Sequence, residues 1–420
     1  MKKIKLDKYL ETLTDYHSGG SYKTLAENTK ILHNKDYAVM VRTLNFENDD
    51  FLNNLIYCDK SSYEFLTYSH VYENDILINK IANPGSVYIM PKVDYKATCG
   101  MNLFLLRPKN INPRYLYYVM KANEKYIKSK SHGTTTKTIT KEDVRKLEFK
   151  VHETLYEQDL VTKLLSSIDY ILINNKKMIR KQNELLNILF SYYFLQFDFP
   201  AENGKPYKSS GGKMVYNKQL KMEIPYGWDV CLFDDVVNKV NGFAFSSEDY
   251  CEGGIYKIYT IKNVQDGYVL PETDNHINEI PSSMNRECVL EPGDIILSLT
   301  GNVGRSGLVF EKKALLNQRV LKISPKDIPK SYLYALVQNE NFKKFAERLA
   351  VGTTQKNLSP IQLGKIPIIF PSKDILIYFD KLTAHLTDAI VSEYIENAEL
   401  KSLRNFLLPL LMNGQATINR

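Results

Sequence analysis

The chain repeats part of its own sequence at an offset of 219 residues. Gly133-Thr134-Thr135-Thr136-Lys137 recurs as Gly352-Thr353-Thr354-Gln355-Lys356. Three further runs recur at this offset or within two residues of it: Asp75-Ile76-Leu77 as Asp294-Ile295-Ile296, Asn83-Pro84-Gly85 as Asn302-Val303-Gly304, and Tyr115-Leu116-Tyr117 as Tyr332-Leu333-Tyr334. Solenoid repeats are only about 20–50 residues long, so this repeat is a duplicated domain with the helix that follows it. Two similar modules on one chain indicate a protein that reads two similar targets at once.

The composition is that of a globular protein without disulfides or membrane spans. With 420 residues, the chain is long enough for two to four domains. Its 5 cysteines are scattered with no Cys-x-x-Cys pair, which argues against a thiolate zinc site and a disulfide framework and favours a reducing compartment. The basic N-terminus is followed by no apolar run, and no stretch approaches the roughly 18 apolar residues of a membrane span. We therefore expect a cytoplasmic protein.

The positive charge is concentrated in one region. The net charge of the whole chain is +7. Residues 107–150 alone contain twelve basic and four acidic side chains, an excess of eight positive charges. This clustering points to a polyanionic partner. A solvated lysine-rich surface would explain the charge alone equally well.

Residues 1–150 and 226–371 form the two expected modules, and each has the pattern of a mixed helix and strand domain. Short apolar runs bounded by Gly, Pro and Asn predict strands. The clearest runs lie at residues 37–41, 75–78, 256–261 and 293–297. One helix is expected over residues 113–129, with a proline at its start, and its counterpart over residues 331–349.

A heptad repeat of apolar residues follows each module, at residues 151–198 and 372–414. About four sustained heptads in each segment favour a coiled coil over two helices that each pack only on their own module. The fold that we expect is therefore α+β. Two α/β domains are joined by two long helices that pack as an antiparallel coiled coil, with a pseudo-twofold internal repeat.

Polar residues interrupt both apolar seams near the middle of each helix. Asn175 and Gln182 lie on the first seam, and Glu393 and Glu396 lie on the second. Basic residues flank the first pair: Lys176, Lys177, Arg180 and Lys181. In an antiparallel pair these middles meet, and the acidic pair faces the basic cluster. We expect this crossing to set the helix register, because a polar seam position fixes register at some cost in stability.

A linker of residues 199–225 joins the first helix to the second module. Its first half is rich in Gly, Ser and Pro, which predicts an extended and mobile segment. Pro409 and Asn413-Gly414 are expected to end the second helix.

We find no motif for catalysis in the sequence. There is no phosphate-binding Gly-x-x-x-x-Gly-Lys-[Ser/Thr] run, and the glycines of residues 301–307 do not have the spacing of a dinucleotide fingerprint. The 7 histidines are dispersed and form no His-Glu-x-x-His motif. Tyr, Asn, Lys, Arg and Thr, which contact phosphates and base edges, are abundant. The chain is therefore expected to be a binding protein and not an enzyme.

Four motifs of the chain occur together in one protein family. They are the linker motif of residues 197–216, the entry motif Ile224-Pro225-Tyr226-Gly227-Trp228, the repeated Gly-Thr-Thr-x-Lys run, and residues 407–415 at the C-terminus. Together they resemble the specificity subunits of type I restriction-modification systems, over essentially the whole chain. The first module departs from the family pattern because it lacks the Pro-x-Gly-Trp entry and has Leu147-Glu148-Phe149-Lys150 where the second has residues 366–371.

This resemblance implies that the chain supplies recognition and its partners supply chemistry. Each module would be a target recognition domain that binds one half of a split, asymmetric double-stranded DNA sequence. The paired helices would fix the spacer. From Val161 to Leu189 the first helix would span about 42 Å, a little over one turn of DNA. Two methyltransferase subunits with S-adenosylmethionine and restriction subunits using ATP and Mg would be the partners, with no cofactor or metal in this chain.

We expect the DNA contacts on loops of both modules. The candidates in the first module are Arg42, Thr43, Asn45, Lys80, Asn83, Thr134, Thr135 and Lys137. Those in the second are Lys262, Asn263, Asn302, Arg305, Thr353, Thr354 and Lys356. Arg and Lys bind guanine, and Asn binds adenine, through paired hydrogen bonds in the major groove. The alternative for each is a turn residue, and for threonines 134–136 it is a helix cap.

Two other functions fit parts of the sequence. A coiled-coil scaffold could bind nucleic acid non-specifically through its basic face, and its binding would then follow salt and length alone. An enzyme with an unrecognised site would show turnover by the isolated chain. Methylation at a single bipartite motif would instead identify a sequence-specific subunit.

Overall fold

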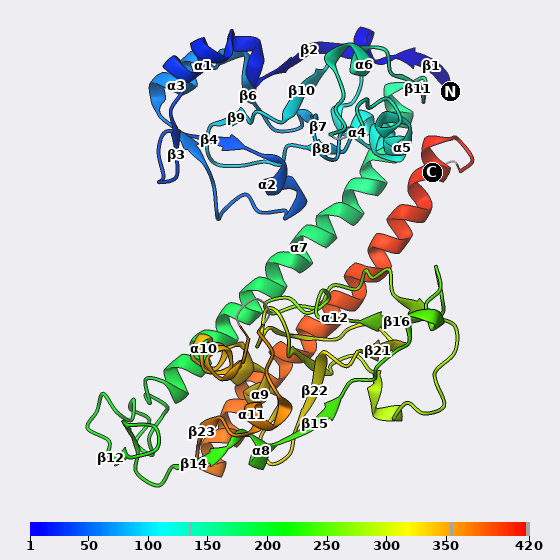
Figure 1. Ribbon diagram of the computed structural model, residues 1–420. Helices are drawn as coiled ribbons and strands as arrows, with labels where there is room; N and C mark the ends of the chain where they lie inside the picture. Colours follow the sequence, from blue (N-terminus) through cyan, green and yellow to red (C-terminus); the bar gives the residue numbers. More distant parts are fainter. Residues whose placement is uncertain (135, 353–355, 417–420) are drawn as a thin grey trace. The chain divides into compact units, whose positions relative to one another are not determined.

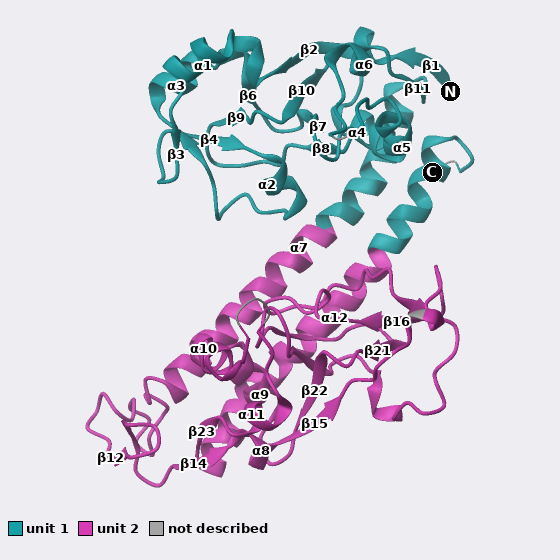
Figure 2. Ribbon diagram, in the orientation of Figure 1, with its two compact units in different colours: residues 1–170, 401–420 teal, residues 171–400 magenta. Residues whose placement is uncertain are grey.

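The computed structural model describes residues 1–134, 136–352 and 356–416, apart from the side chain of Ser247. The chain divides into two compact units (Figure 2). Unit 1 contains Met1–Tyr170 and Lys401–Arg420, and unit 2 contains Ile171–Leu400. Two long helices, α7 (Leu155–Phe194) and α12 (Lys373–Met412), each contribute residues to both units (Figure 1).

Unit 1 contains three sheets and several short helices. The first sheet has the order β2 (Leu10–Asp15), β10 (Leu103–Pro108), β7 (Ile76–Asn79), β8 (Val87–Ile89). The second has the order β3 (Ile31–Leu32), β5 (Tyr57–Cys58), β4 (Ala38–Val41), β9 (Ala97–Cys99), β6 (His70–Val71). The third pairs β1 (Lys2–Lys5) with β11 (Glu148–Val151). The helices are α1 (Tyr22–Asn28), α2 (Thr43–Glu47), α3 (Lys60–Phe65), α4 (Pro113–Ala122), α5 (Glu124–Lys128) and α6 (Lys141–Arg145), with 3-10 turns at Leu6–Tyr9, Tyr16–Gly19 and Thr67–Ser69.

Unit 2 repeats this topology. Its first sheet has the order β15 (Val237–Asn241), β22 (Val320–Pro325), β19 (Ile295–Ser298), β20 (Ser306–Leu308). The second has the order β17 (His276–Ile277), β16 (Tyr256–Tyr259), β21 (Ala314–Leu316), β18 (Val289–Leu290). The third pairs β14 (Asp229–Leu232) with β23 (Pro367–Phe370). The helices are α8 (Phe233–Val236), α9 (Lys330–Gln338), α10 (Glu340–Leu349) and α11 (Pro360–Gly364), with 3-10 turns at Ser247–Asp249 and Arg286–Cys288. A hairpin of β12 (Met214–Asn217) and β13 (Met222–Pro225) precedes them.

The sequence repeat is carried by repeated backbone bonds. The amide of Lys80 donates to the carbonyl of Asn102 at 2.8 Å, and the amide of Leu299 donates to the carbonyl of Arg319 at 3.1 Å. The strands also pair alike, because β4 with β9 and β16 with β21 are parallel pairs inside otherwise antiparallel sheets. The shared Asp of each copy holds its own sheet through an ion pair, Asp75 with Arg107 and Asp294 with Lys322, each at 2.7 Å. The two units are therefore one fold built twice.

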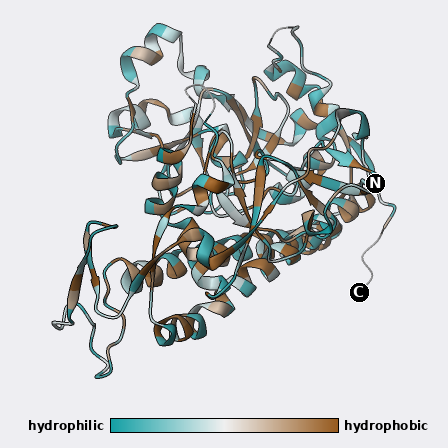
Figure 3. Ribbon diagram, turned by 60° about the horizontal axis from the view of Figure 1, so that its bottom comes forward, coloured by the Kyte–Doolittle hydropathy of each residue, from teal (hydrophilic) through white to brown (hydrophobic). Residues whose placement is uncertain are grey.

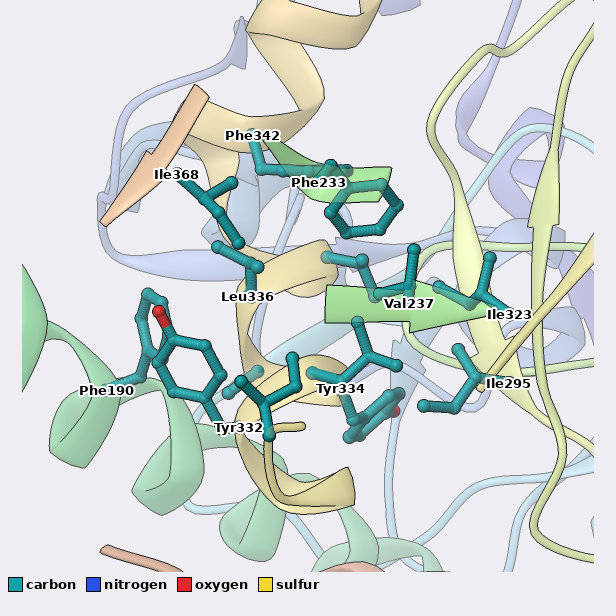
Figure 4. Packing of buried hydrophobic residues seen from close by; sticks show 14 of the residues in the cluster. Phe190, Phe233, Val237, Ile295, Ile323, Tyr332, Tyr334, Leu336, Phe342 and Ile368 are labelled. Atoms are coloured by element: carbon teal, nitrogen blue, oxygen red, sulfur yellow. The ribbon is translucent and has the colours of Figure 1, made fainter. Parts of the chain in front are cut away.

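Each unit has its own core on the helices α7 and α12. In unit 1 the core is aliphatic where the helices enter it, with Leu165, Leu408 and Leu411 buried. In unit 2 it is aromatic. Phe190 lies beside Tyr332, and Phe233 beside Phe342, at ring distances of 5.6 and 5.1 Å (Figure 4). Figure 3 shows many strand positions with hydrophobic colours, as expected for strands that bury their side chains.

The two helices run antiparallel. In unit 2, Asn175 donates to Glu396 at 2.6 Å and Gln182 donates to Glu393 at 3.0 Å, so partner numbers fall along α12 as they rise along α7. In unit 1, Asp169 pairs with Arg404 at 2.7 Å. The predicted polar layer is present, but its acidic residues meet the seam amides. Arg180 is exposed, and within the described ranges no ion pair joins it to Glu393 or Glu396.

Three local predictions were wrong. The helices expected over residues 113–129 and 331–349 are each split by an asparagine, because Asn123 leaves helical geometry and Asn339 is extended and caps α10 through Asn341. Helix α12 continues through Pro409, which was expected to end it, but it does end at Met412, directly before Asn413-Gly414 as predicted.

The linker is not extended. Phe199 is buried and stacks on Trp228 at 4.8 Å and on Tyr207 at 4.7 Å, and the carboxylate of Asp198 accepts hydrogen bonds from Ser209. Aromatic burial therefore holds a segment that its Gly, Ser and Pro content predicts to be free. The boundaries of the recognition domains themselves stay a prediction.

Candidate nucleic-acid interface

A tight turn follows β7 in unit 1 and β19 in unit 2. The amide of Gly85 donates to Asn79, and that of Gly304 donates to Ser298, at 2.9 and 3.0 Å. Both glycines have positive φ, +86 and +82°. A Cβ on Gly85 would lie 2.9 Å from the backbone nitrogen of Lys128 in α5, so only glycine lets this turn pack on the helix. The preceding Asn83 and Asn302 are exposed at the equivalent position.

A second loop lies against each turn. In unit 1, Thr138 bridges both Ile81 and His132, and in unit 2, Asn357 bridges both Thr300 and Val351. These bridges repeat at the offset of 219, so the residues on either side of the shared Gly-Thr-Thr-x-Lys run are held in equivalent places in the two copies. We call residues 81–85 together with 132–138 the turn–loop pair of unit 1, and residues 300–304 together with 351–357 the turn–loop pair of unit 2. Both terms refer only to the residues that the structure describes.

The turn–loop pairs present exposed polar and basic side chains. Thr134 and Lys137 are exposed in unit 1, and Lys356 is exposed in unit 2. The predicted contacts Thr135, Thr353 and Thr354 lie outside the described residues. The helix beside each pair adds exposed basic residues, among them Lys125 in α5, and Lys344 and Arg348 in α10. Within the described ranges, no ion pair engages these side chains, which leaves their charge for a polyanion.

The helix caps that were the alternative role for threonines 134–136 are formed by other residues. Thr140 accepts a hydrogen bond from Asp143 at the start of α6, and Ser359 accepts one from Ile361 at the start of α11. These caps again lie 219 residues apart. Exposed Thr134 keeps its place among the candidate contacts.

Two predicted asparagines are structural. The side-chain oxygen of Asn45 accepts from the amide of Arg42 at 2.8 Å, and that of Asn263 accepts from the amide of Thr260 at 2.9 Å. Their amide groups donate to backbone carbonyls, Asn45 to Asp50 and Asn263 to Leu270. Both side chains are buried, at 4% and 2% exposure, so we remove them from the candidate contacts.

Lys80 is also buried, inside a charge cluster. Its ammonium group lies 2.8 Å from the carboxylate of Asp15, which Lys141 approaches to 2.6 Å. Burial raises the pKa of Asp15, but hydrogen bonds from Lys141, Lys80 and Ser18 outweigh it and lower that pKa to about 2. The pKa of nearby His17 is lowered, first by burial and then by the charge of Lys80. Lys80 therefore stabilises unit 1 and leaves the candidate contacts as well.

The remaining candidates lie at the ends of strands. Arg42 is half-buried and donates to the carbonyl of Asn54 at 2.9 Å, with Thr43 next to it. Lys262 is exposed. Arg305 is half-buried and pairs with Asp266 at 3.3 Å, which holds it beside the turn.

The prediction from sequence missed one further turn in each unit. It lies between β9 and β10 in unit 1, at Met101 and Asn102, and between β21 and β22 in unit 2, at Gln318 and Arg319. All four side chains are exposed. The turns lie 217 residues apart and their residues differ, so a search for identical runs passes over them.

The described part of the chain contains no group of three or more His, Cys, Asp and Glu residues that could hold a metal ion. Within the same residues, no helix has both the length and the apolar character needed to cross a membrane.

Comparison with known proteins gives one family. The family model described as the type I restriction modification DNA specificity domain matches residues 21–187 and 225–401. The type I restriction enzyme MjaVIII specificity subunit of Methanocaldococcus jannaschii is 26% identical over 359 residues, which cover 83% of this chain and 80% of that protein. The HindI specificity subunit of Haemophilus influenzae is 22% identical and covers 87% and 92%. The S subunit from M. genitalium has a similar fold, with a TM-score of 0.57 at 17% identity and coverage of 100% and 96%.

Proposed function

The chain belongs to the type I restriction modification DNA specificity family, and from this premise we propose that each of its units reads one half of a bipartite DNA target. The observation that carries this proposal is that each unit has an equivalent turn–loop pair. The two turn–loop pairs repeat at the offset of 219 residues, and both present exposed Asn and Lys side chains. A duplicated reading surface is suited to two half-sites. Differences around the shared residues make the half-sites different.

The exposed lysines and the exposed asparagines have different tasks in this proposal. Lys137 and Lys356 neutralise phosphates, which positions each unit on the duplex without reading its sequence. Asn83 and Asn302 reach base edges, where an Asn side chain can pair with adenine in the major groove. Arg305, which pairs with Asp266, recognises guanine in this proposal.

The helices and the partner subunits complete the proposal. Because α7 and α12 both contribute to each unit, their length sets the spacer between the half-sites. Two methyltransferase subunits that carry S-adenosylmethionine, and restriction subunits that use ATP and Mg, act in the cytoplasm on the sequence that this chain selects. The chain itself performs no catalysis and needs no cofactor.

The test is to purify the chain with the methyltransferase of its own system and to map methylated bases on genomic DNA. We expect a single asymmetric motif in two parts with a fixed spacer. Methylation without a motif, together with binding that depends only on salt and DNA length, would instead identify a non-specific scaffold.

A further inference from the structure

A hollow lies beside the turn–loop pair of unit 2. Its volume is about 650 Å³, and its polar lining comes from Asn241, Thr300, Gln318, Arg319, Asn357 and Ser359. Leu299 also lines it, as does Pro360. The hollow therefore joins the turn of Gln318 and Arg319 to the shared loop.

The repeated strand register shows what occupies this place in unit 1. Phe104 pairs with both Asp15 and Ile78, and Leu321 pairs with both Asn241 and Leu297, so Asn241 stands where unit 1 has Asp15. The amide of Lys80 donates to Asn102 in the turn of unit 1, and the amide of Leu299 donates to Arg319 in the equivalent turn of unit 2. Leu299 therefore stands where unit 1 has Lys80. Pro360 follows the cap of α11 as Lys141 follows the cap of α6.

The charge cluster of unit 1 is thus replaced as a set in unit 2. In unit 1 the carboxylate of Asp15 pairs with Lys80 at 2.8 Å and with Lys141 at 2.6 Å. Asn241, Leu299 and Pro360 cannot form ion pairs, and the site stays hollow. The two copies of the fold therefore differ at these positions, with three charged side chains in unit 1 and none in unit 2.

The rim of the hollow carries free hydrogen-bonding groups. The side chains of Gln318 and Arg319 are exposed, and within the described ranges neither makes a hydrogen bond or ion pair. Their backbone is rigid, because the amide of Asn317 donates to Tyr259 at 3.1 Å and that of Val320 donates to Asn317 at 2.9 Å. A fixed turn with two unpaired, neighbouring donors has the form of a recognition element.

We propose that Gln318 and Arg319, above the hollow of unit 2, read a purine-containing step of the second half-site in the major groove. This rests on the proposed function. Arg pairs in a bidentate manner with guanine, and Gln with adenine, and Asn241 at the wall of the hollow adds a further donor and acceptor. In unit 1 the equivalent Met101 and Asn102 line a smaller hollow of about 320 Å³ together with Arg42 and Thr43, and Met101 offers an apolar side chain that suits a thymine methyl group. The two half-sites differ at this step.

The experiment uses the full chain with its methyltransferase and compares methylated motifs by base-resolution sequencing. The double variant Gln318→Met/Arg319→Asn imports the pair of unit 1. We expect the second half-site to relax or change at one step, with roughly 5- to 150-fold weaker binding to the original sequence and no change in the first half-site. The matched control Lys356→Ala should weaken binding and leave the motif intact.

A second variant tests the hollow itself. Asn241→Asp/Leu299→Lys brings the charge pair of unit 1 into unit 2 and fills the space, so the same step should lose its preference. An unchanged motif in the exposed Gln318→Met/Arg319→Asn variant overturns the inference. Failure of the wild-type complex to give any bipartite motif overturns the proposed function instead.

Discussion

Units 1 and 2 have equivalent backbone bonds but different interiors. Unit 1 has the ion pairs of Asp15 with Lys80 and Lys141, whereas unit 2 has a hollow lined by Leu299 and Asn241 at the equivalent positions. The long helices also differ, since they meet unit 1 through aliphatic residues and unit 2 through aromatic rings in edge-to-face contact. The comparison teaches that the duplicated backbone holds the turn–loop pairs in equivalent places, whereas the side chains beneath them have diverged.

The largest effect is expected in the aromatic core of unit 2. Phe194 is 1% exposed and lies 4.8 Å from the ring of Tyr332 and 4.9 Å from that of Phe379. Phe194→Ala removes these contacts and leaves a cavity, so the free energy of unfolding of unit 2 should fall by about 3–5 kcal/mol. Hydrogen exchange measured by mass spectrometry should show faster exchange in β19 and β22.

The control is Phe406→Ala on α12, where the ring is 66% exposed. It should change exchange little in either unit. Equal loss of protection in β7 and β19 after Phe194→Ala would contradict the assignment of separate cores.

The next effect tests the charge cluster of unit 1. Lys80→Leu places the residue of unit 2 into unit 1 and leaves the buried carboxylate of Asp15 with Lys141 and Ser18. We expect a loss of about 1–3 kcal/mol in the free energy of unfolding at pH 7, measured by urea titration. The reverse change Leu299→Lys buries an unpaired ammonium group and should also destabilise.

The pH dependence of stability should also differ between the wild type and Lys80→Leu. Because the folded pKa of Asp15 is about 2, below its ordinary value, its ionised form stabilises the fold above pH 4, and this contribution is lost as the pH falls towards 2. In Lys80→Leu the folded pKa of Asp15 moves up towards its ordinary value, so the fall in stability with acid that is due to Asp15 becomes smaller and is complete at a higher pH. A pH profile identical in both proteins would show that Lys80 does not hold the carboxylate.

The sequence predicted the strand and helix pattern better than the contacts. The strands at residues 75–78 and 293–297 are β7 and β19, because runs of buried aliphatic residues after a turn have few alternatives. The antiparallel helix pair also followed from its heptads and its polar seam. These are local patterns, and a local pattern is visible in a single sequence.

The candidate site was predicted only where the repeat marked it. Asn83, Asn302, Lys137 and Lys356 stand at repeated positions and are exposed. Lys80 could not be placed from the sequence, because a lysine is normally exposed and its partner Asp15 lies 65 residues away. Gln318 and Arg319 share no sequence with the equivalent Met101 and Asn102. Only the backbone hydrogen bonds that repeat around both turns show that the two positions are equivalent.

A smaller effect concerns the exposed lysines of the turn–loop pairs. If Lys137 and Lys356 contact phosphates as proposed, Lys137→Ala and Lys356→Ala each remove one such contact from equivalent places. Each should weaken DNA binding uniformly across sequences and reduce the slope of log affinity against log salt by roughly 0.9. Fluorescence anisotropy over a range of salt concentrations measures this, with the exposed Lys218→Ala on the β12–β13 hairpin as the control. A variant that instead alters the methylated motif would make that lysine a base contact.

The smallest effect concerns the seam of the helices within unit 2. Burial raises the pKa of Glu393, as does the charge of Glu396, while the hydrogen bond from Gln182 lowers it. Its Oε2 and the Oε1 of Gln182 are buried without a hydrogen-bond partner among the described residues. A raised carboxyl pKa stabilises the fold only below the unfolded pKa and loses this stabilisation as the pH rises through the folded value.

Glu393→Gln should therefore raise the free energy of unfolding at pH 7 by about 0.5 kcal/mol, because an amide needs no charge and can donate to Gln182. Urea titrations at pH 4 and pH 7 should show a smaller difference between the two pH values in the variant than in the wild type. Glu396→Gln is the matched control, since its exposed side chain keeps an oxygen that accepts from Asn175. If Glu393→Gln instead lowers the free energy of unfolding at both pH values, the charge of Glu393 stabilises the helix register. The burial of this carboxylate would then not be a net cost to unit 2.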